Sequence, residues 1–221
     1  MTDSKPGQGY VGRSVRTIEG RAPVAGAATY SNDMIFEGQL YAAIVRSPHA
    51  AAKIKSVDAS GAYKVPGVVK VMDGREADEH IDPITHYIDP AVFGGQAATI
   101  RCLALDEVWC YGQPVAVVVA QDKKTAHYAA QRVQVDYELL DPIIEIDDAI
   151  ATDARIVAEG WNSNLLLQVP FTNGDPDGAF ERADHVVKTT VRIHRFSTQP
   201  IETRCYNAVW EEQTQSITLY A

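Results

Sequence analysis

Residues 112–139, GQPVAVVVAQDKKTAHYAAQRVQVDYEL, decide the fold of this chain. The run 115–120 is short, apolar and β-branched, which is typical of a buried strand. Asp122 can then cap a helix, and 134–139 returns as a second strand. Four apolar side chains share one face of that helix: Ala126, Ala129, Ala130 and Val133. This order predicts an α/β fold, with helices packed on a mixed sheet.

The same order of elements is predicted nearer the N-terminus. The apolar run LYAAIV at 40–45 is closed by the turn-forming pair Ser47-Pro48, as expected of a strand. A short helix begins at Asp58 and ends before Pro66-Gly67, and 68–72 is a further strand. Both patterns favour the α/β (α+β) class.

The acidic segment 73–101 has no sustained period and is expected to form a long surface excursion. His80 and His86 stand there among carboxylates that could bind a divalent metal: Asp78, Glu79, Asp82 and Asp89. Because Pro83 breaks any helical register between the two histidines, the spacing matches no known ligand pattern, and we predict a solvated loop without metal.

The motif Phe93-Gly94-Gly95-Gln96 lies in the same excursion. Its glycines would let backbone N–H groups approach an anionic cofactor. No helix is predicted to follow it, so a plain flexible turn is the better interpretation.

The C-terminal third of the chain has a different pattern. Asp175 can cap a short helix that runs through Arg182, and the segment from His185 onward alternates as a strand does. The stretch 205–220 predicts two strands joined around 212–215. Because a lone hairpin is marginal in water, these strands predict an incomplete second α/β domain.

The composition limits the possible functions. The net charge of −9 disfavours binding to nucleic acid or to an anionic membrane, and no apolar run is long enough for membrane insertion. The three cysteines lack CxxC spacing, which indicates neither a disulfide framework nor a thiolate metal site and fits a cytoplasmic protein. Cys110, between Trp109 and Tyr111, is expected in the core. The motifs of hydrolases, dinucleotide-binding proteins and P-loop nucleotide-binding proteins are missing from the sequence.

Several phrases together resemble the molybdenum-carrying subunits of the xanthine dehydrogenase, aldehyde oxidase and aerobic carbon monoxide dehydrogenase family. They occur in order at 12–14 (GRS), 26–30 (GAATY) with Asp33, 40–50 (LYAAIVRSPHA), 54–71 (IKSVDASGAYKVPGVVKV), 112–120 (GQPVAVVVA), 126–138 (AHYAAQRVQVDYE) and 174–184 (GDPDGAFERAD). Together they cover nearly the whole chain.

The resemblance implies four regions. Residues 1–20 would be an extended N-terminal arm and 21–147 the α/β hammerhead domain of the family. Residues 148–164 would be a linker, and 165–221 the beginning of the molybdopterin-binding domain, truncated or completed by another chain.

The resemblance also indicates candidate site residues. Arg195, Pro200, Glu202 and Arg204 match an R-x4-P-x-E-x-R phrase of the family. Arg195, Glu202 and Arg204 would support the cofactor region from outside it, or would instead form a buried ion pair that fixes the domain seam. The pterin-binding glycine loops, the glutamine near molybdenum and the glutamate general base have no counterpart here. The loop at 93–96 only mimics one of them, so no catalytic residue is expected.

The resemblance implies part of a molybdenum hydroxylase that inserts oxygen from water into a C–H bond. The substrate would be an aldehyde, an N-heterocycle, a purine or carbon monoxide. Molybdopterin and molybdenum would be bound in the assembled complex, with iron–sulfur clusters and FAD on partner chains. This chain would be a scaffold, inactive without a C-terminal molybdenum-subunit polypeptide. The alternative is a non-enzymatic binding module that retains the hammerhead fold.

Overall fold

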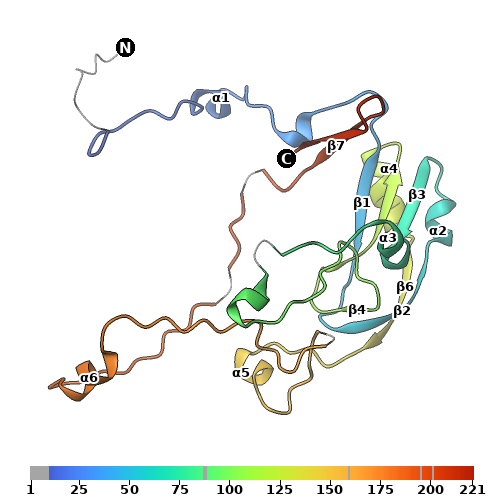
Figure 1. Ribbon diagram of the computed structural model, residues 1–221. Coiled ribbons are helices and arrows are strands. Elements are labelled where there is room, and N and C mark those ends of the chain that lie inside the picture. The colour runs from blue at the N-terminus through green and yellow to red at the C-terminus, as the bar shows by residue number, and fades with distance from the viewer. Residues whose placement is uncertain (1–9, 87–88, 159, 195, 201) are drawn as a thin grey trace. The chain divides into compact units, whose positions relative to one another are not determined.

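The computed structural model describes residues 10–86, 89–158, 160–194, 196–200 and 202–221 (Figure 1). The chain forms two compact units, Gly38–Lys188 and a smaller unit that combines Met1–Glu37 with Thr189–Ala221. Helices and antiparallel sheets occur together, which confirms the α/β class predicted from the sequence.

The larger unit contains two three-stranded sheets. The first has the order β1 (Tyr41–Arg46), β5 (Pro114–Ala120), β3 (Val68–Asp73), and the second has the order β4 (Glu107–Val108), β2 (Ala52–Asp58), β6 (Gln134–Leu139). The β-branched run of β5 forms the centre of the first sheet, where Val118 pairs with Ala43 of β1 and Val71 of β3.

The helices of the larger unit are short. They are α2 (Ser60–Tyr63), α3 (Gly74–His80), α4 (Lys123–Ala130), α5 (Ile146–Ala149) and α6 (Pro176–Glu181), with a 3₁₀ turn η2 (Pro90–Phe93). Helix α4 packs on β1, β5 and β3. Its buried alanines, Ala126 and Ala129, let it lie close to the sheet, and Val118, Val71 and Ala62 lie in the same apolar core.

The sequence predicts a mixed sheet, whereas all described strand pairs run antiparallel. The strand–helix–strand order of β5, α4 and β6 is present, but β5 and β6 belong to different sheets. The reason is that β1 and β3 occupy both edges of β5, so the chain leaving α4 pairs with β2 instead.

The excursion 73–101 begins as a helix, which the sequence analysis missed. Asp73 caps α3, because its Oδ1 accepts a hydrogen bond of 3.0 Å from the Glu76 backbone N. Gly74 allows a close approach, since a Cβ there would lie 2.0 Å from the Ala104 carbonyl oxygen. This contact anchors the excursion to the segment before β4.

Two further sequence predictions are wrong. The segment from His185 onward forms no strand within the described residues up to 194, where its side chains are exposed. Cys110 is exposed rather than buried. It lies in a tight turn in which Gln113 N donates to its carbonyl oxygen, and Gly112 takes a φ of 82°. Such a turn places its residues at the surface.

The smaller unit combines both ends of the chain. Its elements are α1 (Arg21–Val24), the 3₁₀ turn η1 (Ser31–Asp33) and the hairpin β7 (Asn207–Glu211) and β8 (Ser216–Tyr220). This hairpin confirms the prediction of two strands that are joined around 212–215. The Phe36 and Tyr220 rings lie 5.1 Å apart, so the N-terminal segment contacts the hairpin within this unit. Among the described residues, the helices are all too short or too polar to cross a membrane.

Candidate functional site

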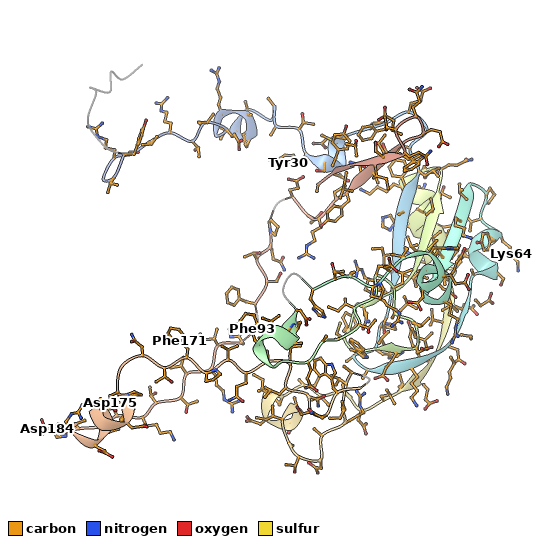
Figure 2. The ribbon with its side chains drawn as sticks, viewed as in Figure 1. Tyr30, Lys64, Phe93, Phe171, Asp175 and Asp184 are labelled. Atoms are coloured by element: carbon orange, nitrogen blue, oxygen red, sulfur yellow. The ribbon has the colours of Figure 1, made fainter. Side chains whose placement is uncertain are left out.

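The family phrase around Glu202 lies in the smaller unit, against η1. Glu202 Oε1 accepts a hydrogen bond of 3.2 Å from the Ser31 backbone N, and Asn207 Nδ2 donates to the Ser31 carbonyl oxygen at 2.6 Å. Ser31 is therefore held through both its backbone N–H and its carbonyl oxygen, and it is 8% exposed. Figure 2 labels the neighbouring Tyr30. Glu202 and Asn207 thus anchor η1 to the C-terminal segment.

The η1 turn also stabilises itself. The Tyr30 backbone N donates to Asp33 Oδ2 at 3.1 Å, and Asp33 N donates to the Tyr30 carbonyl oxygen at 2.9 Å. Tyr30 and Asp33 belong to the stretch whose resemblance to the family was evident from sequence. The roles of Ser31 and Asn207 were missed, because no local pattern reveals contacts between segments this far apart in the chain.

Arg204, the second described candidate, has an exposed side chain. Arg195 lies outside the described residues. Within the part of the chain that the structure describes, the ion pairs involve neither Glu202 nor Arg204. The hydrogen bond that the Ser31 N–H donates to Glu202 is the described contact of this phrase.

These residues do not by themselves form a cradle for molybdopterin. An anionic cofactor needs several converging N–H donors or cations. Arg204 offers one exposed guanidinium, whereas Glu202 carries a negative charge and uses Oε1 for Ser31. We therefore assign no chemical step to this segment.

The acidic excursion does not assemble a metal site in the described residues, where groups of three or more metal-binding side chains are absent. Asp78 instead pairs with Arg101, and His86 Nε2 lies 2.9 Å from the Ala98 carbonyl oxygen. His80 lies in the last turn of α3. These contacts give the predicted candidates a structural role.

The phrase 40–50 forms a buried corner after β1. Ser47 is 1% exposed, and its Oγ accepts a 3.0 Å hydrogen bond from His49 N. The His49 ring meets the Tyr137 ring edge-on at 5.0 Å. Burial raises the pKa of Tyr137. The family phrase thus ties β1 to β6 through packing.

A surface hollow of about 340 Å³ adjoins α6. It is lined by Pro176, Ala179, Phe180, Ala183, His185, Val186 and Val187. Asp175 caps this helix through a 3.0 Å bond from Gly178 N, as predicted (Figure 2). Phe180 is 63% and Val187 89% exposed, so the hollow is apolar and open.

The comparisons with known proteins agree with the sequence phrases. The family model described as "aldehyde oxidase and xanthine dehydrogenase, a/b hammerhead domain" matches residues 25–141. The model of the molybdopterin cofactor-binding domain matches 158–221.

Relatives extend along nearly the whole chain. The nicotine 6-hydroxylase large subunit of Paenarthrobacter nicotinovorans is 31% identical over 211 residues, which is 95% of this chain and 25% of that protein. The crystal structure of quinoline 2-oxidoreductase from Pseudomonas putida 86 superposes with a TM-score of 0.82 at 31% identity, over 94% of this chain and 26% of that one. Aldehyde oxidoreductase from Desulfovibrio desulfuricans gives a TM-score of 0.61 at 30% identity, over 67% of this chain and 17% of that one.

The chain spans about a quarter of the length of the curated relatives it matches. The hammerhead model alone accounts for more than half of its residues. The chain therefore belongs to the aldehyde oxidase and xanthine dehydrogenase family of molybdenum-containing large subunits, of which it represents the hammerhead and the first part of the molybdopterin-binding domain.

Proposed function

We propose that this chain is the N-terminal portion of a molybdenum hydroxylase that oxidises a C–H bond of an N-heteroaromatic ring, with water as the oxygen source. The supporting observation is the similarity to quinoline 2-oxidoreductase, with a TM-score of 0.82 over 94% of the chain, against 0.61 over 67% for an aldehyde oxidoreductase. The nicotine hydroxylase among the relatives is also named for an N-heterocyclic substrate.

The role of this chain in that enzyme is scaffolding and subunit contact. The Glu202 carboxylate contributes by holding η1 in place. We propose the exposed Arg204 as a supporting cation for the cofactor region. When bound, the molybdenum cofactor supplies the site that accepts the substrate's electrons. No residue of this chain is proposed as a proton donor or acceptor in the reaction.

The proposed partners follow from the family and from the exposed surface. Large apolar side chains are exposed along the C-terminal part of the chain, among them Phe171, Val187, Phe196 and Leu219. Surfaces of this kind mark contacts with other protein. We propose that the remaining part of the molybdenum subunit covers them, that iron–sulfur and FAD-binding chains carry the electrons away, and that the complex is cytoplasmic.

The experiment is gentle purification of the chain with its native complex on a sizing column. Molybdenum and iron are measured in each fraction, and oxidation of quinoline, an aldehyde, xanthine and carbon monoxide is followed with an artificial electron acceptor. We expect both metals to co-elute with the chain and the N-heterocycle to be the preferred substrate.

Two results would contradict the proposal in different ways. Preference for an aldehyde, a purine or carbon monoxide would overturn the substrate class and leave the family role intact. Elution of the chain alone, free of metal, would overturn the enzymatic role and favour the binding module that retains the hammerhead.

A further inference from the structure

One side chain of the loop 93–98 forms hydrogen bonds with the first residues of the molybdopterin-binding segment. Gln96 Nε2 donates to the Leu165 carbonyl oxygen at 2.8 Å and to the Ser163 carbonyl oxygen at 3.2 Å. Gln96 Oε1 accepts from Asn162 N at 3.0 Å. A single primary amide therefore binds three backbone groups within four residues, and it uses both its donors and its acceptor.

The main chain of the same loop adds two further contacts. Gln96 N donates to the Leu166 carbonyl oxygen at 2.9 Å, and the Trp161 indole Nε1 donates to the Ala97 carbonyl oxygen at 2.8 Å. The segment 161–166 is thus fixed at both ends and in the middle.

Gly95 makes this close approach possible. A Cβ at this position would lie 2.8 Å from the Leu166 carbonyl oxygen and 3.0 Å from the Pro90 carbonyl oxygen. The loop is itself ordered, since Asp89 Oδ1 accepts from Ala91 N at 2.9 Å and Gly95 N donates to the Pro90 carbonyl oxygen at 2.8 Å. The turn predicted from the sequence therefore has internal hydrogen bonds and also binds the segment 161–166.

Asn164 of the same segment forms hydrogen bonds with the backbone of 149–157. Its Nδ2 donates to the carbonyl oxygens of Ala149 and Arg155, at 3.0 and 2.8 Å, and its Oδ1 accepts from Val157 N at 2.9 Å. The residues between the two matched family domains, 142–157, are thereby folded onto the segment. Together these bonds explain why the compact larger unit continues past 158 to Lys188.

We propose that Gln96 is a positioning residue, which sets where the molybdopterin-binding segment leaves the hammerhead domain. Loop 93–98 belongs to the first family domain and 161–166 to the second, so Gln96 forms a latch between them. Both segments lie within the larger unit, which ends at Lys188. The proposal concerns the position of this segment and does not rest on the proposed function.

The test uses the full chain with two independent substitutions. Gln96→Met keeps the length of the side chain and removes its hydrogen bonds, including the three to backbone groups. Gly95→Ala pushes the Leu166 carbonyl away while leaving Gln96 unchanged. The matched control is Gln131→Met, at an exposed position next to α4. The reference chain and each variant also carry Trp109→Phe and Trp210→Phe, so that Trp161 is the single indole.

Hydrogen exchange and indole fluorescence are then measured. Both latch variants are expected to speed amide exchange in 161–167 by about tenfold, as for the loss of hydrogen bonds of ordinary net strength. Exchange in β5 should stay unchanged, and Trp161 emission should shift to longer wavelength. Gln131→Met should leave exchange in 161–167, exchange in β5 and Trp161 emission at the values of the reference chain.

Two outcomes would overturn the latch. Wild-type exchange in 161–167 in both variants would mean that the segment is held without Gln96. An equal rise in 161–167 and in β5 would mean that the substitutions loosen the whole unit instead of one junction. Neither readout requires molybdenum, so failure of the latch is distinguishable from failure of the proposed hydroxylase function.

Discussion

The contact between Glu202 and Ser31 joins residues that are 171 positions apart. Glu202→Ala removes the acceptor of the Ser31 N–H, and an unsatisfied part-buried donor is destabilising. We expect amide exchange across 30–36 to rise about tenfold, while exchange in β5 stays unchanged. Glu202→Gln retains Oε1 and should restore slow exchange. An equal effect of both substitutions would mean that the charge, and not the hydrogen bond, holds the turn.

Val118 lies at the centre of β5 and is fully buried. Val118→Ala removes two methyl groups from the core, which should lower the free energy of unfolding by about 2 kcal/mol. Urea denaturation followed by circular dichroism measures this loss. Val119→Ala is the matched control, because Val119 is half-buried on the opposite face of the same strand. Equal losses at the two positions would contradict the assignment of the core to the Val118 face.

The elements that the sequence predicted well are those determined by local pattern. Strand β5 has a continuous apolar run, and α4 and α6 begin at capping aspartates whose hydrogen bonds the structure contains. Strand β2 was missed because its register is interrupted between Ile54 and Ser56, which breaks the alternation. The latch at Gln96 and the anchor at Glu202 were not predictable, because each depends on a backbone group far away along the chain.

The cap of α4 gives that helix a pH dependence. Hydrogen bonds from the Thr125 hydroxyl and backbone N–H lower the pKa of Asp122 from its ordinary value of 3.8. Because the pKa is lower in the folded chain, the ionised cap stabilises the fold above the ordinary value, and this contribution is lost as the pH falls through the folded value.

Thr125→Val removes the hydroxyl hydrogen bond, which is the larger of the two effects on the pKa of Asp122, and it keeps a side chain of similar shape. We expect the pKa of Asp122 to move up towards 3.8, as measured by NMR titration of its carboxyl carbon. The difference in the free energy of unfolding between wild type and variant should stay constant above about pH 5. It should narrow as the pH falls below the ordinary value of 3.8. Asp58, whose pKa is lowered by Ser60, is the internal control and should keep its shift. An unchanged Asp122 titration would show that the hydroxyl plays no part.

The exposed apolar side chains of the C-terminal part should lower the solubility of the isolated chain. In the proposed subunit the same side chains should contribute to binding. Phe171 is 93%, Val187 89% and Phe196 74% exposed. Replacing all three with serine should make the isolated chain more soluble and reduce its binding of an apolar dye, since less apolar surface meets water. The same variant should bind the remaining molybdenum-subunit polypeptide more weakly, because these side chains would be buried there. The matched control replaces their polar neighbours in sequence: Thr172→Ala, Lys188→Ala and Ser197→Ala. Gain of solubility with undiminished assembly would mean that a different surface contacts the rest of the subunit.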